Sequence, residues 1–389
     1  MHVIFVNYHH FVDASGIHIF FLANELKKLG VSSTVCIPTH PQRENQFGEP
    51  DFEVQLYEDM NKLSVLRRLL LKARDPIVHA WTPRENVRQM TESLCRALFC
   101  DYYVHLEDNE EAILANEAGM PAEEVARLSP DALTGRLRPD IIHPGHYKGF
   151  LSRANGISCI FETLSEFAPP GIPNFVFWPA CEPEFYKMSS QPDTNGRARL
   201  GLSADEFVLG YTGNMHLANA GEITELYQAI GLANQRGVRT RLIRTGNNFC
   251  PFKADVQDVQ TKYTLELGSR SSYEIRQLIG MTDALVQPGG ANEFNNYRFP
   301  SKLPMYLASS KPVILPLTNI GAYLTDGVNC LLTQHGTADE LADRIVLLSG
   351  DSDLRVRLGI GGRVFAKNHF SWSRSAEALL EFYEQTRLS

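Results

Sequence analysis

The segment 287–316, QPGGANEFNNYRFPSKLPMYLASSKPVILP, combines the residue types that bind phosphate groups. A strand is predicted at its start, followed by a Gly-Gly loop and a polar run that ends in Arg298. Pro300 and Ser301 are predicted to open a helix that contains Lys302. The free N–H groups of a helix start and two nearby cations favour an anionic ligand such as a diphosphate. The alternative is a long loop followed by an ordinary capped helix.

Three successive strands of the C-terminal half are each followed by a glycine and polar residues. One such turn is an ordinary turn signal, and a turn without a ligand is the alternative for each. Ligands of parallel sheets bind beyond the carboxyl ends of the strands, so together the turns favour a nucleotide pocket. The candidate residues are Gly213, Asn214, Arg244, Gly246, Ser269 and Arg270.

A predicted strand of the N-terminal half ends in His105-Leu-Glu107-Asp108. Alternation along the strand places His105, Glu107 and Asn109 on one face and Asp108 on the other. An imidazole and carboxylates at a strand end can orient sugar hydroxyls or transfer protons, and we select His105 as a catalytic candidate. Asp108 has a structural alternative, in which it caps the next helix and Glu111 completes a capping box.

The first predicted strand is followed by the turn Asp13-Ala-Ser15-Gly16. A glycine lets the backbone approach a ligand closely, and the helix start that follows suits an anionic group. The alternative is a tight turn without a ligand. The turn lacks the G-x-G-x-x-G pattern of dinucleotide-binding proteins, which argues against a dehydrogenase.

Strand and helix patterns alternate along the chain, which predicts two doubly wound α/β domains in series, each with a parallel sheet. We predict an N-terminal domain over 1–187 and a C-terminal domain over 199–372, with a linker at 186–198. An amphipathic helix is predicted in 373–389, and short helices in 116–150. Strands are predicted at 1–7, 31–38, 75–81, 101–108, 156–163, 174–180, 207–213, 240–246, 264–268, 283–289 and 312–316.

Length and composition agree with two globular domains. The 389 residues carry a net charge of −8, so the chain lacks the basic footprint of a nucleic-acid-binding protein. The seven cysteines are widely spaced without a C-x-x-C pair, which predicts neither disulfides nor a zinc site and favours the cytoplasm. The apolar residues 1–7 are predicted as a strand rather than a signal peptide, and no apolar run reaches the ~18 residues of a membrane span.

Residues 60–75 form a predicted amphipathic helix with basic side chains. Such a helix can lie on an anionic membrane surface, which for a cytoplasmic protein is the inner membrane face. The alternative is a helix that packs on the sheet with its charged face in solvent. The basic residues are Lys62, Arg67, Arg68, Lys72 and Arg74.

The segment 287–316 resembles the retaining GT-B glycosyltransferases of family 4, whose pattern is an acidic or amide-rich loop followed by P-x-K-x-x-E-Y-x-A-x-G-x-P-V-I. The matching positions are Pro300, Lys302, Tyr306, Ala308 and 312–314. Three further stretches resemble the family in the same order along the chain. They are the glycine loop and first helix in 15–36, the stretch before the linker in 176–186, and the closing helix in 370–383.

The resemblance implies two Rossmann-like domains that face each other across a deep cleft. The N-terminal domain would hold the acceptor, the closing helix would cross back to it, and the C-terminal domain would hold a nucleotide sugar. Gly16 would approach the donor, and Ser269 and Arg270 would flank the nucleobase. The catalytic residues would be His105, Glu293 and Lys302. The donor-binding residues would be Ser15, Gly16, Gly213, Asn214, Arg244, Gly246, Ser269, Arg270, Asn295, Asn296, Tyr297, Arg298 and Ser301.

The sequence departs from the family pattern in two places. The helix glutamate that contacts the ribose is replaced by Met305, and its upstream acidic partner falls at Tyr297, with Glu293 nearby. The Arg/Lys pair that usually follows the strand-end glycine is missing from GNMHLANAG, and Arg298 or Arg244 would supply that charge.

The implied reaction is transfer of a sugar, with retention at the anomeric carbon, to a glycan or lipid-linked acceptor in polysaccharide or glycoconjugate synthesis. We expect a UDP-sugar donor, UDP-glucose in particular. No metal or cofactor is expected, because Lys302, Arg298 and N–H groups would stabilise the leaving diphosphate. Two alternatives stay open: a non-catalytic GT-B protein that binds a nucleotide sugar, favoured by Met305, and a nucleotide-sugar epimerase, which would need carboxylates at the sugar.

Overall fold

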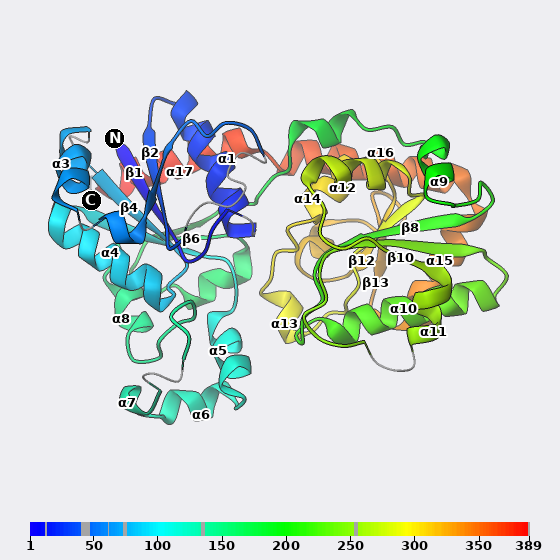
Figure 1. Ribbon diagram of the computed structural model, residues 1–389, viewed down its shortest axis with the longest axis horizontal. Coiled ribbons are helices and arrows are strands. Elements are labelled where there is room, and N and C mark those ends of the chain that lie inside the picture. Colours follow the sequence, from blue (N-terminus) through cyan, green and yellow to red (C-terminus); the bar gives the residue numbers. More distant parts are fainter. Residues whose placement is uncertain are drawn as a thin grey trace. The chain divides into compact units, whose positions relative to one another are not determined.

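The computed structural model describes residues 1–11, 14–39, 47–60, 62–72, 76–133, 137–252 and 256–387 (Figure 1). The chain divides into two compact units. Unit 1 comprises Met1–Pro179, Tyr297–Phe299 and Ser371–Ser389, and unit 2 comprises Ala180–Asn296 and Pro300–Phe370. One parallel sheet lies in each unit, with helices around it, which confirms the predicted α/β class.

The described sheet of unit 1 has the strand order β3-β2-β1-β4-β5-β6-β7, and all neighbouring pairs are parallel. The strands are β1 (His2–Asn7), β2 (Ser32–Ile37), β3 (Glu53–Leu56), β4 (Pro76–Trp81), β5 (Asp101–Leu106), β6 (Gly156–Cys159) and β7 (Asn174–Val176). Every residue of β1 and β4 is buried, as a sheet covered on both faces requires. Trp81 is in register with Asn7 on one side and His105 on the other, so these side chains share a face.

Helices connect and follow the strands of unit 1 in the part of the chain that the structure describes. They are α1 (Ala14–Lys28), α2 (Tyr57–Met60), α3 (Leu63–Lys72), α4 (Glu85–Leu98), α5 (Glu110–Ala118), α6 (Ala122–Arg127), α7 (Pro130–Leu133), α8 (Tyr147–Ser152) and α17 (Trp372–Arg387). The short helices α6, α7 and α8 confirm the prediction for 116–150. The C-terminal helix α17 packs against α1, and α4 packs against β4 and β1.

The helix after β5 begins later than the capping hypothesis requires. The cap residue of α5 is Asn109, whose side chain accepts a hydrogen bond from the Ala112 amide at 3.0 Å. The prediction that Asp108 is the N-cap was therefore wrong, as was the capping box with Glu111. Asp108 instead lies 3.9 Å from the Arg84 guanidinium, and Glu111 accepts a hydrogen bond from the Tyr147 hydroxyl.

The basic helix α3 exposes apolar as well as charged side chains. Leu63 is 81% exposed and Leu71 is 78% exposed, whereas Leu69 is fully buried. Lys62 forms an ion pair with Asp59. Arg74 lies outside the described residues, and membrane contact through this helix stays a prediction. In the described part of the chain, no helix is both long and apolar enough to cross a bilayer.

The described sheet of unit 2 has the order β10-β9-β8-β11-β12-β13 and is also parallel. Its strands are β8 (Phe207–Thr212), β9 (Thr240–Thr245), β10 (Thr264–Glu266), β11 (Ala284–Val286), β12 (Val313–Pro316) and β13 (Leu331–Thr333). Its helices are α9 (Thr194–Arg199), α10 (Ala220–Gln235), α11 (Gln257–Tyr263), α12 (Ser272–Gly280), α13 (Glu293–Asn296), α14 (Leu303–Ala308), α15 (Ala338–Gly350) and α16 (Ser352–His369). Helices α10 and α15 pack together over the core (Figure 1).

Part of the predicted linker is an ordered helix. The α9 helix begins after Asp193, whose carboxylate accepts a hydrogen bond from the Gly196 amide at 2.9 Å. Arg197 is buried, donates to the Met281 carbonyl at 2.6 Å and pairs with Asp283 at 2.7 Å. These contacts reach residues more than 80 positions away and are invisible in the local composition on which the linker prediction rests.

Candidate functional site

Three glycine turns meet at the carboxyl edge of the unit 2 sheet. A Cβ atom on Gly246 would lie 2.3 Å from the Gly213 carbonyl oxygen, so the two turns are packed backbone against backbone. The Gly213 amide donates to the Thr245 carbonyl at 3.0 Å, and the Gly246 amide donates to the Gly268 carbonyl at 2.9 Å. The structure therefore brings together the turns that follow β8, β9 and β10, as the parallel sheet predicts.

Lys302 extends to the same edge from the start of α14. Its ammonium group donates to Gln287 Oε1 at 3.1 Å and lies 5.2 Å from the centre of the Tyr211 ring. A Cβ atom on Gly213 would lie 3.2 Å from the Lys302 nitrogen and 3.0 Å from the Tyr211 hydroxyl, so the glycine turn lies directly beside the ammonium group. A half-buried positive charge next to a glycine turn can hold an anion such as a phosphate group.

The helix that carries Lys302 is tied to the end of β8. Tyr306 is fully buried, and its hydroxyl accepts a hydrogen bond from the Thr212 amide at 2.7 Å and lies 3.0 Å from the Thr212 hydroxyl. The regular helix begins at Leu303, so the predicted start at Pro300 was three residues too early. Ser301 is exposed in the turn before it.

Arg244 lies in the interior of unit 2, next to the glycine turns. It is fully buried, donates to Asn248 Oδ1 at 2.6 Å and to Glu266 Oε2 at 2.8 Å, and approaches the Gly213 carbonyl at 3.3 Å. These contacts engage both terminal nitrogens of the guanidinium. Asn214 is exposed, and its side chain accepts from the Asn247 amide at 2.8 Å.

Side chains of the amide-rich loop after β11 fix the loop in place through hydrogen bonds. Asn295 is buried and donates to Glu222 Oε1 at 2.5 Å and to the Gly290 carbonyl at 3.0 Å. Asn296 accepts from the Thr318 hydroxyl at 2.5 Å. The side chain of Glu293 lies outside the described part of the structure, so its predicted role is untested.

Two predicted donor-binding residues belong to unit 1. The Tyr297 hydroxyl donates to Glu166 Oε2 at 2.8 Å, and its ring lies 5.4 Å from that of Phe167. The pKa of Asp108 is raised, mainly by burial, and the charges of Arg84 and, to a smaller extent, Arg298 oppose this shift. Ser269 and Arg270 remain in unit 2 as exposed residues after β10.

A second polar cluster lies at the carboxyl edge of the unit 1 sheet, around Glu107. This carboxylate is 8% exposed and receives donors from two elements distant in sequence. The Ser15 hydroxyl of α1 donates to Oε2, while His18 Nδ1 lies 2.9 Å from Oε1. The Trp81 indole N–H, at the end of β4, donates to Oε1 at 2.8 Å.

The charge of Glu107 is stabilised by these contacts. Burial by itself would raise its pKa, but the hydrogen bond and charge of His18, the His105 ring and the Ser15 hydroxyl lower the pKa to about 2. A carboxylate that is ionised at physiological pH at a strand end can orient polar groups around a ligand. Sequence alternation placed Glu107 beside His105 but gave no sign of the donors, so Glu107 was not selected as a site residue.

His105 lies next to this cluster and is fully buried. Its ring stacks on Phe177, with 5.0 Å between the ring centres, and makes a tilted contact with Trp81 at 4.0 Å. Burial lowers its pKa to about 3, so the ring is neutral at physiological pH. Its Nδ1 atom lies 2.8 Å from the Ser158 hydroxyl oxygen.

Gly16→Ala should destabilise unit 1 by about 1–3 kcal/mol. An added Cβ atom would lie 2.5 Å from Phe11 Cα and 2.9 Å from the His10 carbonyl oxygen, which are backbone atoms that cannot rotate away. Urea unfolding followed by tryptophan fluorescence measures this loss, because all the tryptophans lie in unit 1. They are Trp81, Trp178 and Trp372.

The control for Gly16→Ala is Gly149→Ala in α8 of the same unit. There the added Cβ atom would meet only the Arg153 guanidinium, at 3.3 Å, which belongs to an exposed side chain and not to the backbone. Equal stability changes in the two variants would contradict the close packing of the first turn.

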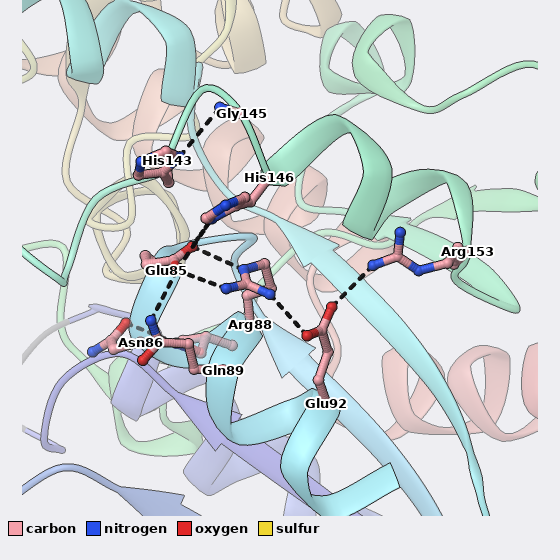
Figure 2. Close-up of polar contacts among 10 residues, drawn as sticks. Glu85, Asn86, Arg88, Gln89, Glu92, His143, Gly145, His146 and Arg153 are labelled. Carbon is pink, nitrogen blue, oxygen red and sulfur yellow. Dashed lines mark hydrogen bonds and ion pairs between the residues drawn. The ribbon is translucent and has the colours of Figure 1, made fainter. Parts of the chain in front are cut away.

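A chain of ion pairs holds the outer side of α4 (Figure 2). It runs from His146 to Glu85 at 3.3 Å, to Arg88 at 2.6 Å, to Glu92 at 2.8 Å and to Arg153 at 2.9 Å. Burial would raise the pKa of Glu85, but the hydrogen bonds led by those from Arg88 lower it to about 2. These contacts join α4 to α8, which indicates a structural role.

One hollow of unit 2, with a volume of about 590 Å³, lies away from the glycine turns. It is lined by the segment around Met188 and by the end of α12 near Gly280. The end of α12 precedes β11, so the hollow lies near the amino ends of the strands, opposite to the edge where ligands of parallel sheets bind. Among the described residues, no cluster of three or more His, Cys, Asp or Glu side chains is arranged to hold a metal ion.

No family model matches the chain. Over 120 residues the chain is 29% identical to an uncharacterised glycosyltransferase of Methanocaldococcus jannaschii. The match covers 31% of this chain and 32% of that protein. The chain thus spans about a third of the length of this curated relative.

Solved glycosyltransferase structures are similar to this chain over its whole length. HepE of Anabaena in complex with UDP has a TM-score of 0.71 at 15% identity and covers 99% of this chain and 100% of its own. The chain has a GT-B glycosyltransferase fold. Sucrose-phosphate synthase of Thermosynechococcus elongatus has a TM-score of 0.69 at 13% identity, covering 99% of this chain and 98% of its own. WaaG, a glycosyltransferase involved in lipopolysaccharide biosynthesis, has a TM-score of 0.62 at 14% identity, covering 97% of this chain and 99% of its own.

At these identities the likeness shows the fold. It confirms the pair of Rossmann-like sheets that the resemblance implied. Retention at the anomeric carbon, membership of family 4 and independence of metal ions stay predictions. The roles of the individual site residues stay predictions as well.

Proposed function

We propose that this protein is a glycosyltransferase that takes a sugar from a UDP-sugar, with UDP-glucose as the first candidate. The observation that carries the proposal is the Lys302 ammonium group beside the Gly213 turn, at the carboxyl edge of a Rossmann-like sheet. A diphosphate needs positive charge and close backbone approach, and this edge offers both. HepE, whose fold is similar, was solved with UDP and with UDP-glucose, which supports a uridine nucleotide.

The chemical contribution of this edge would be electrostatic. In the proposed reaction the bond between the anomeric carbon and the diphosphate oxygen breaks, a bond from the anomeric carbon to the acceptor oxygen forms, and negative charge grows on the leaving oxygen. A fixed ammonium group stabilises this charge more in the transition state than in the ground state. We propose retention at the anomeric carbon, with a leaving-group oxygen taking the acceptor proton, and we propose that no metal ion is required. A glycan or lipid-linked acceptor in polysaccharide or glycoconjugate synthesis is proposed with it.

Calorimetric titration of the purified protein with UDP-glucose, UDP, GDP-mannose and GDP tests the donor. We expect binding of the uridine nucleotides in the absence of metal ions and much weaker binding of the guanosine nucleotides. Repeating the titration with added Mg²⁺ or Mn²⁺ tests the proposed independence of metal. Stronger binding of GDP-mannose than of UDP-glucose would overturn the donor assignment.

A non-catalytic protein that binds a nucleotide sugar is the second candidate. The residue that favours it is Met305 in α14, a half-buried thioether at the position where the resembling family has a ribose-binding glutamate. Binding of UDP-glucose without slow hydrolysis of the bound donor, and without transfer to any glycan in an acceptor library, would support this candidate. Release of glucose from UDP-glucose would exclude it.

A further inference from the structure

A row of buried hydrogen-bonding groups runs across the unit 1 sheet from the C-terminal helix to His105. The Tyr383 hydroxyl of α17 lies 2.6 Å from His79 Nδ1, and His79 Nε2 lies 3.1 Å from the Ser158 hydroxyl oxygen. That oxygen lies 2.8 Å from His105 Nδ1. All four side chains are fully buried, so their hydrogen bonds to one another are shielded from water.

The far end of the row is an unpaired atom. His105 Nε2 is buried and has no hydrogen-bond partner in the described part of the chain. The His105 ring contacts the ring of Trp81, whose indole nitrogen donates to Glu107. The row therefore ends beside the polar cluster at the strand ends rather than in the apolar interior.

The direction of donation follows from the acidity of the groups. A phenol is a stronger hydrogen-bond donor than an imidazole N–H, and an imidazole nitrogen is a stronger acceptor than a phenol oxygen. Tyr383 therefore donates to His79 Nδ1, and the short distance of 2.6 Å agrees with an O–H···N bond. His79 then donates from Nε2 to Ser158, and the Ser158 hydroxyl donates to His105 Nδ1. Either direction leaves one hydrogen of the row without an acceptor inside it. In the reverse direction this is the Tyr383 O–H, and in the chosen direction it is the N–H at His105 Nε2, beside the strand ends, where a ligand oxygen can accept it.

We propose that Tyr383, His79 and Ser158 are positioning residues that hold His105 in the neutral form with its proton on Nε2. His105 then presents a fixed N–H donor at the strand ends, suited to an acceptor oxygen of a ligand. The assignment of that oxygen to a hydroxyl of the transferred sugar rests on the proposed function. The tautomer itself does not depend on it.

The two histidines and the tyrosine of the row stay uncharged near pH 7. Burial lowers the pKa of His105 to about 3 and the pKa of His79 well below its ordinary value, so both rings stay neutral near pH 7. Burial also raises the pKa of Tyr383, which keeps its hydroxyl protonated as a donor. The row is thus a chain of neutral groups in which one proton position determines the next.

NMR of the imidazole nitrogens in isotope-labelled full-length protein tests the tautomer directly. The signals of His105 are assigned by their loss in His105→Gln. In the wild type we expect a protonated Nε2 and an unprotonated, hydrogen-bonded Nδ1. A proton on Nδ1, or a doubly protonated ring near pH 7, would overturn the proposal, whatever the protein catalyses.

Tyr383→Phe removes the first donor of the row. We expect the His79 Nδ1 signal to move to that of a nitrogen without a donor, and the His105 signals to shift as a second tautomer becomes populated. The matched control is Tyr103→Phe. Tyr103 is equally buried and its ring lies 4.8 Å from that of Tyr383, but its hydroxyl bonds to Thr386 outside the row. Unchanged His79 and His105 signals in Tyr383→Phe would contradict the row.

The effect of the same variants on catalysis is measured separately. If the proposed function holds, Tyr383→Phe should lower kcat/KM for transfer about tenfold, and Tyr103→Phe should leave it unchanged. Folding of each variant is checked by tryptophan fluorescence. If His105 is protonated on Nε2 but the protein has no transferase activity, the proposed tautomer is supported and the proposed function is disproved. If the protein transfers sugar but His105 is protonated on Nδ1, the proposed function is supported and the proposed tautomer is disproved.

Discussion

Glu107→Ala should lower the free energy of unfolding of unit 1 by about 3–5 kcal/mol. The buried carboxylate accepts hydrogen bonds from the Ser15 hydroxyl and the Trp81 indole, and His18 lies within hydrogen-bonding distance of it. Removal of this acceptor leaves these groups without a partner in an enclosed site, and each buried unsatisfied group costs about 1–3 kcal/mol. Urea unfolding followed by tryptophan fluorescence measures the loss in unit 1.

Glu123→Ala is the matched control, because Glu123 is an exposed glutamate on α6 of the same unit. It should change the stability by less than about 0.5 kcal/mol. If Glu107→Ala falls within the same range, Glu107 does not hold the strand ends together, and its role in the cluster is disproved.

The same carboxylate gives unit 1 a defined acid sensitivity. The pKa of Glu107 is lowered from 4.5 to about 2 in the folded protein, so its stabilising contribution is complete above about pH 4.5 and is lost as the pH falls towards 2. The lost contribution amounts to about 3 kcal/mol. The difference in the free energy of unfolding between wild type and Glu107→Gln should therefore shrink as the pH falls over this interval. The other carboxylates are present in both proteins, so their pH-dependent contributions cancel in the difference. A difference that is constant with pH would contradict the lowered pKa.

Lys302→Met should reduce kcat/KM for sugar transfer about a hundredfold to a thousandfold. The ammonium group of Lys302 lies beside the Gly213 turn and over the Tyr211 ring. The substitution removes this charge but keeps a side chain of similar length and apolar character. The proposed role of this charge is stabilisation of the leaving diphosphate, so kcat should fall more than the affinity for the donor. Steady-state kinetics and calorimetric titration with UDP-glucose separate the two effects.

Lys262→Met is the control for Lys302→Met. Lys262 is an exposed lysine on α11 of the same unit, away from the strand-end turns. Its loss should leave kcat/KM unchanged within about twofold. Transfer by Lys302→Met at more than a third of the wild-type kcat/KM would show that the ammonium group does not act on the leaving group.

Much of the fold could be predicted because it depends on local patterns. The strands β1, β4 and β8 are short apolar runs whose residues are all buried, and continuous burial produces a continuous apolar sequence. The edge strand β3 and the short strand β13 were missed. The four residues of β3 are only partly buried and mix charged with apolar side chains, so they carry no apolar run.

The placement of the glycine turns was also predictable from sequence. Parallel strands carry their following loops to one edge, so turns that follow successive strands must meet. The close approach of Gly213, Gly246 and Lys302 follows from this rule. Their proposed contact with a nucleotide is a chemical hypothesis that the strand order does not test.

Tertiary structure alone decided which partners the polar side chains have. Arg244 was predicted as a ligand-binding cation, and in the structure it is fully buried. Glu266 balances its charge, and Glu266 and Asn248 accept hydrogen bonds from its Nη1 atom. Glu107 accepts hydrogen bonds from residues 92 and 26 positions away, and the row that holds His105 begins at Tyr383 in the last helix. Periodicity indicates which face of an element is buried, but the identity of a hydrogen-bond partner depends on how distant elements pack. The sequence by itself therefore determined the two parallel sheets and their polar edges, and the packing of α1 and α17 on the first sheet determined which of those polar groups are held in place.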